Sequence, residues 1–291
     1  MTLKIKNYLV LIIIIMAFAS CKKYDEAIIT GNTVPPDQTI SNNIIENFVN
    51  KSYISLLGRK PNSVEFTAGV SLLKLNNLSA TDRNSFLNQV LSKPEYDAHL
   101  FDINNIDLLN NLDTNEFTGK ILLFQFLLSD SSYISYWPIL QIEMARLLVM
   151  QQILPQLQNG TAKTIDLHRV LIDNYFFDQI NMGSLNFVVS MYQHFLRRYP
   201  TENELNNGIA MVDGDFAITF QQTGNSKTDF ITIFFASNDY YEGQVRDLYL
   251  RYLFREPTSS ESATLTIQYK SSNDYKQLQQ TILVTDEFIG L

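Results

Sequence analysis

Apolar residues recur every three or four positions over most of the chain after residue 40, which is the spacing of helices that bury one face. The clearest of these stretches end at Leu57, Leu196 and Leu253. Strict alternation of apolar and polar residues, which is typical of a strand, occurs only briefly between Phe216 and Gln221, where an irregular loop would also fit. The pattern therefore predicts an all-α fold.

One sequence pattern occurs three times, at 49–66, 188–205 and 245–262. The aligned positions are Tyr53, Tyr192 and Tyr249; Leu57, Leu196 and Leu253; Arg59, Arg198 and Arg255; Pro61, Pro200 and Pro257; and Glu65, Glu204 and Glu261. A second block follows each copy, at 86–96, 230–240 and 278–288, and ends in an acid and an aromatic residue; the acids are Glu95, Asp239 and Glu287. Because all three copies keep the same order, we interpret them as repeats of one unit.

The chemistry of the repeated residues predicts a helix, a turn and two further helices. The arginine is expected in the last turn of the first helix, where a cation interacts favourably with the helix dipole. The proline two residues later stops that helix. Each proline is followed by a capping box, which begins at Asn62, Thr201 or Thr258 and ends at the repeated glutamate. The arginine and this glutamate are expected to pair across the turn, which favours a structural role over an anion-binding one.

The predicted architecture is a single all-helical domain over residues 40–291, a helical bundle of three related helix–turn–helix units with a helical insertion. The units lie at about 44–99, 185–243 and 244–291, and the insertion at about 100–184. Within the insertion, 117–128 and 139–157 are apolar enough to be buried against the repeats, with Pro155 ending or kinking the second segment. Residues 163–180 are expected to form one more helix.

The N-terminal segment determines the predicted compartment. Lys4 and Lys6 precede an apolar run over 8–18 that is too short to span a bilayer, and small residues then lead to Cys21, the only cysteine. Residues 18–21 resemble the lipobox of bacterial lipoproteins, which implies removal of residues 1–20 and attachment of lipid to Cys21. An ordinary signal peptide or an uncleaved anchor with a chance cysteine is the alternative.

The residues after Cys21 bear on location. Residues 22–26 resemble the starts of Bacteroidota outer-membrane lipoproteins, some of which reach the cell surface. The resemblance implies a lipid-anchored protein of the outer membrane, on its periplasmic or external side. Residues 21–39 lack a helical period and contain Gly31, Pro35 and Pro36, so we expect a flexible tether.

The repeated unit resembles the L-G-R-x-P-[ST]-x-x-E unit of several bacterial surface and exported families, and it is similar to the helical repeats of phycobilisome linker-like domains. The resemblance implies a non-enzymatic protein that binds other proteins or surfaces, and it carries no chromophore site. The first copy fits best, with Gly58 before Arg59. Arg197 and Phe254 replace this glycine in the other copies, which leaves open whether the tight turn is kept there.

Composition excludes several kinds of function. The chain has 22 basic and 30 acidic residues and a net charge of −8, which disfavours nucleic-acid binding. His99, His168 and His194 lack metal-ligand spacing, and Asp213-Gly214-Asp215 lacks the later acid of a calcium loop, although proximity of the histidines in the fold stays open. No catalytic or nucleotide-binding motif occurs. We therefore expect no catalytic residue, cofactor or metal.

The predicted function is that of a non-catalytic protein-interaction or structural module at the cell envelope. The alternative is a glycan- or nutrient-binding accessory lipoprotein of an outer-membrane uptake system, and an enzyme of unrecognised class is a third possibility. Scaffolding predicts an exposed apolar patch, and glycan capture predicts exposed rings along a groove, Trp137 among them. An enzyme predicts a deep pocket with shifted pKa values.

Overall fold

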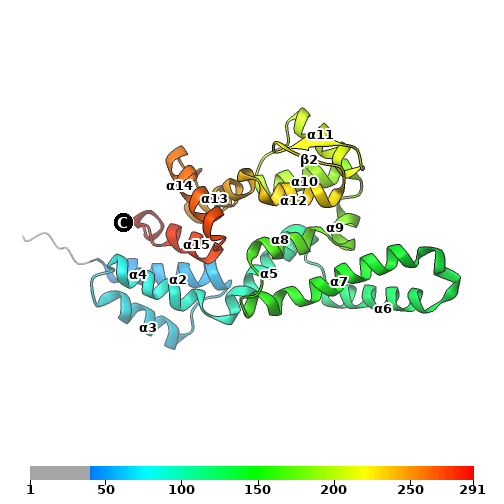
Figure 1. Ribbon diagram of the computed structural model, residues 1–291. Coiled ribbons are helices and arrows are strands. Elements are labelled where there is room, and N and C mark those ends of the chain that lie inside the picture. Colours follow the sequence, from blue (N-terminus) through cyan, green and yellow to red (C-terminus); the bar gives the residue numbers. More distant parts are fainter. Residues whose placement is uncertain (1–39) are drawn as a thin grey trace, which may run out of the picture. The chain divides into compact units, whose positions relative to one another are not determined.

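The computed structural model describes residues 40–291, which form one compact unit. The prediction of an all-α fold is confirmed, since helices make up nearly all of the regular structure in this part of the chain (Figure 1). The predicted signal peptide and tether, Cys21 included, lie outside the described residues.

Each repeat consists of three consecutive helices, followed by a fourth that begins within the last three residues of the second block. The helices are α2 (Asn42–Leu57), α3 (Ser63–Lys74), α4 (Ala80–Leu91) and α5 (Pro94–Leu109) in repeat 1; α10 (Ser184–Leu196), α11 (Glu202–Val212), α12 (Lys227–Ala236) and α13 (Asn238–Leu253) in repeat 2; and α13, α14 (Ser259–Ser272), α15 (Tyr275–Leu283) and α16 (Asp286–Ile289) in repeat 3. Helix α13 therefore ends repeat 2 and begins repeat 3.

Repeats 1 and 2 share a close contact that the sequence alignment did not single out. A side chain at Gly69 would lie 2.9 Å from Phe86, and one at Gly208 would lie 2.8 Å from Val188 and 3.2 Å from Phe230. Each glycine thus leaves room for a phenylalanine of the following helix. Repeat 3 has leucine at both corresponding positions, Leu265 and Leu278, and both are buried. Repeat 3 thus has a larger residue on its second helix and a smaller one on its third, so the interface between these helices stays filled.

The last repeat packs against the first, which joins the two ends of the described chain. Helix α15 contacts α4, and α16 contacts α2. The Arg83 guanidinium donates to Asp286 Oδ1 at 2.6 Å and to the Val284 carbonyl at 3.1 Å. The ring centres of Phe48 and Phe288 lie 6.1 Å apart in an edge-to-face arrangement, one that aromatic pairs prefer.

The insertion contains α6 (Thr114–Ser129), the 3-10 helix η1 (Ser131–Tyr136), α7 (Trp137–Gln158), α8 (Thr164–Ile172) and α9 (Tyr175–Ile180). Two helices stand where one was predicted over 163–180, because the Asn174 side chain accepts from the amides of Phe176 and Phe177 and starts a new helix. Helix α7 continues through Pro155 to Gln158. Helix α5 runs on to Leu109, beyond the predicted end of repeat 1.

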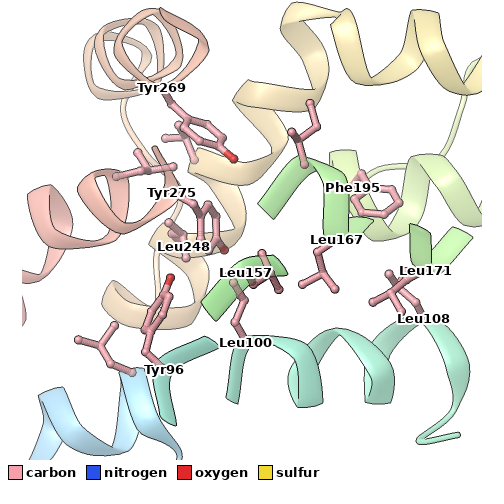
Figure 2. Close-up of a cluster of buried hydrophobic side chains, with 14 of the residues drawn as sticks. Tyr96, Leu100, Leu108, Leu157, Leu167, Leu171, Phe195, Leu248, Tyr269 and Tyr275 are labelled. Atoms are coloured by element: carbon pink, nitrogen blue, oxygen red, sulfur yellow. The ribbon is translucent and has the colours of Figure 1, made fainter. Parts of the chain in front are cut away.

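The expected burial of the two insertion segments is wrong in large part. In α6 only Ile121 and Phe124 are buried, and in α7 the buried residues all lie from Leu147 onward. That inner end of the insertion joins the core of the repeats. Figure 2 shows Leu157 and Leu167 from the insertion among buried side chains such as Leu100, Leu248 and Tyr275.

A short β-hairpin departs from the otherwise helical structure of the described residues. Strand β1 (Ala217–Thr219) pairs antiparallel with β2 (Gln222–Gly224), and Ala217 lies opposite Gly224. Phe220 and Gln221 both have positive φ, as a two-residue type I′ turn requires. The ring of Phe220 stacks on Tyr192 at 5.9 Å. The brief alternation over 216–221 therefore marks a strand and its turn.

Candidate functional site

The turn after the first helix of each repeat has the same backbone conformation in all three copies. The first helices end at Leu57, Leu196 and Leu253, and the next residue is left-handed, with φ of 68° at Gly58, 54° at Arg197 and 55° at Phe254. The turn is therefore kept without glycine. The repeated arginines follow this residue, so the expectation that they lie within the last helical turn is wrong.

In each turn the arginine makes the same set of contacts. Arg59 donates from Nη1 and Nη2 to the two carboxylate oxygens of Glu65, at 2.7 and 2.9 Å. It also donates to the Lys60 carbonyl at 3.1 Å and to Glu95 at 2.8 Å, and its guanidinium lies 5.6 Å from the centre of the Tyr53 ring. The expected pairing across the turn is present and is bidentate.

Repeats 2 and 3 reproduce these contacts closely. Arg198 pairs with Glu204 at 2.7 Å through both nitrogens and with Asp239 at 3.2 Å. Arg255 pairs with Glu261 at 2.9 and 2.8 Å and with Glu287 at 2.6 and 2.7 Å. Their guanidinium groups each lie 5.0 Å from a ring centre, that of Tyr192 and that of Tyr249. Each arginine thus binds acids of its own repeat.

The glutamates are also held by the helix starts that follow Pro61, Pro200 and Pro257. Capping boxes form at Asn62–Glu65, Thr201–Glu204 and Thr258–Glu261, as predicted. The hydrogen bond from the arginine is the main cause that lowers the pKa of Glu204 and of Glu261 to about 2, and it lowers the pKa of Glu65 as well. The carboxylates stay ionised and occupied, so these clusters are suited to fixing the turn.

The second acid of each cluster was visible in the sequence, but its partner was not assigned. Glu95, Asp239 and Glu287 each precede the aromatic residue that ends the second block. The recurrence of an acid at that position is the signal that points to the repeated arginine, since an arginine fork has donors for two carboxylates. The contact ties the start of the fourth helix to the turn after the first.

The Phe254 turn gives a direct stability test. Phe254 is 88% exposed and has φ of 55°, a conformation that costs a residue with Cβ about 1–2 kcal/mol. We expect Phe254→Gly to raise the free energy of unfolding by about 0.5–1 kcal/mol, measured by urea denaturation. Phe254→Ala is the control, because it removes the ring and keeps the strained backbone. An equal gain in both variants would contradict the explanation.

The three histidines line one small cavity of about 40 Å³ between α5, α8 and α10. His168 is buried, its Nδ1 lies 2.9 Å from the Tyr240 hydroxyl, and burial lowers its pKa to about 3. Burial also lowers the pKa of His99 and of His194. The volume suits a few water molecules, since one needs about 10–15 Å³ of such space. Within residues 40–291, no group of three His, Cys, Asp or Glu residues is placed to hold a metal ion.

Charged groups face the histidines across this cavity. Arg251 and Arg197 both pair with Asp247, and Arg251 lies 4.0 Å from Asp107. Gln279 connects two further residues of the lining, because it accepts from the Tyr96 hydroxyl and donates to the Tyr252 hydroxyl at 2.7 Å. The polar groups are satisfied largely by one another, as buried polar networks require.

The segment Asp213-Gly214-Asp215, considered above as a calcium loop, lies at the end of α11. Its Asp213 carboxylate accepts a hydrogen bond from the Ser184 hydroxyl.

The most unusual surface of the described residues is an apolar hairpin, which we define as residues 121–149 of α6, η1 and α7. Ten of its large apolar side chains are at least 38% exposed: Leu122, Leu123, Phe126, Tyr133, Ile134, Tyr136, Ile139, Ile142, Leu148 and Val149. Figure 1 shows α6 and α7 side by side, with their connection away from the helices of the repeats. Large exposed apolar patches mark interaction sites.

Hydrogen bonds hold the connection between the two helices. The Asp130 side chain accepts from the Ser132 amide at 2.9 Å and begins η1. The indole Nε1 of Trp137 donates to the Leu127 carbonyl at 3.1 Å, which ties the start of α7 to the end of α6. The exposed rings of Tyr133 and Tyr136 therefore stand on a fixed turn.

Comparison with known proteins adds no relative. No protein-family model, curated protein or solved structure matches the chain. No helix among residues 40–291 is both long enough and apolar enough to cross a membrane.

Proposed function

We propose that this protein is a lipid-anchored, non-catalytic module of the cell envelope that acts by contact through its apolar hairpin. The observation that carries the proposal is the exposure of ten large apolar side chains on one projecting element. Scattered single exposed apolar residues are normal on a protein surface, but ten on one hairpin are a concentration of the kind that marks a site of interaction.

The geometry of the interior favours contact over catalysis. The shifted histidine pKa values belong to a cavity of about 40 Å³, whereas ligand pockets measure about 300–1,000 Å³. The repeated arginines pair with acids of their own turns, so they serve the scaffold. A glycan-binding role remains the second candidate, and it rests on the exposed Tyr133 and Tyr136 rings beside Trp137.

The anchor is tested by feeding cells a clickable fatty acid and isolating the protein. We expect label on the wild-type chain and none on Cys21→Ser, because Cys21 is the only cysteine. A matched control adds Ser71→Cys to the Cys21→Ser chain, which restores a thiol on the exposed face of α3 without restoring label. Equal labelling of wild type and Cys21→Ser would refute the anchor.

The contact is tested by a photo-crosslinking amino acid placed at Phe126, with Phe216 as the control. Both side chains are well exposed, but Phe216 lies far from the hairpin in sequence, next to β1. We expect adducts in the envelope fraction from position 126 and not from position 216. The same yield at both positions would contradict a role for the hairpin.

A further inference from the structure

The apolar hairpin exposes its large side chains around much of its circumference. On α6, Leu122 and Phe126 lie one helical turn apart, and Leu123 points about 100° away from Leu122. On α7, Ile139 and Leu148 are nine residues apart, which places them on opposite sides of the helix. A flat protein surface would cover only one of these sides, whereas lipid can surround the side chains at the connecting end of the hairpin on every side.

The composition of the hairpin fits the boundary between water and lipid. Between Lys120 and Glu143 the only charged residue is Asp130, and the turn carries Tyr133, Tyr136 and Trp137. Tyrosine and tryptophan favour the headgroup level of a membrane, because one part of each ring is apolar and the other polar. The Asp130 carboxylate has its pKa lowered by hydrogen bonds to Ser132, so it stays charged and limits the depth of insertion.

From these features we infer that the apolar hairpin inserts shallowly into a lipid surface and gives the protein a second membrane contact. The inference rests on the proposed lipid attachment at Cys21 for its reach. The 19 residues from Cys21 to Ile40 span at most about 65 Å. Lipid on Cys21 would therefore hold Ile40 within about this distance of the membrane surface, which raises the effective concentration of the hairpin near lipid.

Charge predicts which lipids bind. Removal of residues 1–20 would remove Lys4 and Lys6. The mature chain would then have 20 basic and 30 acidic residues, a net charge of −10. The only basic residue of the hairpin is Arg146, and it pairs with Glu143 and Asp173. Anionic headgroups therefore offer no attraction, and binding is driven by apolar area. The same negative charge disfavours a second copy of this chain as the occupant of the hairpin.

The test uses the mature chain, residues 21–291 with Cys21→Ser, so that no acyl group contributes. The chain has one tryptophan, Trp137, in the hairpin, and its fluorescence reports on this element alone. With phosphatidylcholine vesicles we expect co-flotation, a blue shift of the emission and quenching by brominated lipid. Adding phosphatidylglycerol to the vesicles should not strengthen binding.

Matched variants locate the contact. Phe126→Ser with Ile139→Ser should weaken vesicle binding about tenfold or more, because both side chains lose apolar area. Phe216→Ser with Ile267→Ser changes two residues outside the hairpin that are even more exposed, and this variant should leave binding unchanged. Circular dichroism shows whether each variant is folded. If the variant with Phe126→Ser and Ile139→Ser does not fold, Asp130→Asn serves as the test instead, because removing the charge at the turn should strengthen vesicle binding.

Three results with the purified chain would overturn the inference: no vesicle binding by the folded chain, equal loss in both double variants, or a concentration-dependent emission shift with dimer formation in the absence of vesicles. Adducts to protein alone from a crosslinker at Phe126 would likewise assign the hairpin to a protein partner. That last result would leave the proposed function standing. Failure of fatty-acid labelling would instead remove the anchor and leave vesicle binding intact.

Discussion

Gly243→Ala should destabilise the fold more than a Gly→Ala substitution at any other helical glycine of residues 40–291. A Cβ at Gly243 would lie 2.0 Å from the Phe195 carbonyl oxygen and 2.9 Å from the Leu196 Cα. Both are backbone atoms at the end of α10, so relief requires that α10 and α13 move apart. We expect a loss of about 3 kcal/mol or more in the free energy of unfolding, or failure to fold, measured by urea denaturation at pH 7.5.

Gly119→Ala is the matched control for this substitution. Gly119 also lies inside a helix, α6, and a Cβ there would meet nothing within 4 Å. The gain in helix propensity should stabilise this variant by about 0.5–1 kcal/mol. If Gly243→Ala unfolded at the same urea concentration as wild type, the close approach of α10 and α13 would be refuted.

The position of Gly243 explains why repeats 1 and 2 differ in their turns. The corresponding residue of repeat 1 is His99, and its ring lies where a side chain at Gly58 would stand, 2.5 Å from the Cβ position. Repeat 1 therefore has the small residue in the turn and the large one on the helix. Repeat 2 has the reverse, with Arg197 in the turn and Gly243 on the helix. Repeat 1 therefore needs glycine in the turn for space, because Arg197 and Phe254 keep the positive φ in the other repeats without it.

The sequence predicted those features that depend on nearby residues. The capping boxes and the Arg–Glu pairs lie within about ten residues of the signals that identify them. The ends of α2, α10 and α13 were predicted only approximately, because each helix stops two residues before the arginine that was expected in its last turn. The left-handed turns at Arg197 and Phe254 could not be predicted, because the glycine that normally indicates such a turn is missing. Contacts from the surrounding Arg–Glu cluster hold the backbone there in place of an intrinsic preference.

The exposure of the apolar hairpin and the meeting of the three histidines could not be predicted, because both depend on how distant helices pack. Apolar residues from Ile121 to Leu128 occupy every face of α6, so the pattern gave no stripe to show which side is buried. The sequence was therefore compatible with full burial and with the exposed hairpin that is found. His99, His168 and His194 come from α5, α8 and α10, and no spacing in the chain could indicate that these helices meet at one cavity.

That cavity makes the stability of the fold depend on mild acid. His168 is buried, and its pKa falls from 6.5 to about 3, first through burial and then through the nearby charge of Arg251. The unfolded chain takes up the proton near pH 6.5, whereas the folded chain stays neutral. The contribution of His168 is therefore complete above pH 6.5 and is lost as the pH falls below it. The paired glutamates act later, because unfolded glutamate titrates near 4.5.

Lowering the pH from 7.5 to 5.0 should accordingly cost about 2 kcal/mol through His168 alone, at about 1.4 kcal/mol per unit below pH 6.5. His168→Gln keeps a polar group beside Tyr240 and does not titrate, so its free energy of unfolding should fall by about 2 kcal/mol less than that of wild type. The quantity compared is the difference in free energy of unfolding between pH 7.5 and pH 5.0 for each protein, so a packing defect of the glutamine that is the same at both pH values cancels. His194→Gln is the control, because His194 is less buried than His168 and its removal should protect less. Identical pH dependence in wild type and His168→Gln would mean that the buried imidazole is protonated in the folded state, and the acid sensitivity would then have to come from the carboxylates.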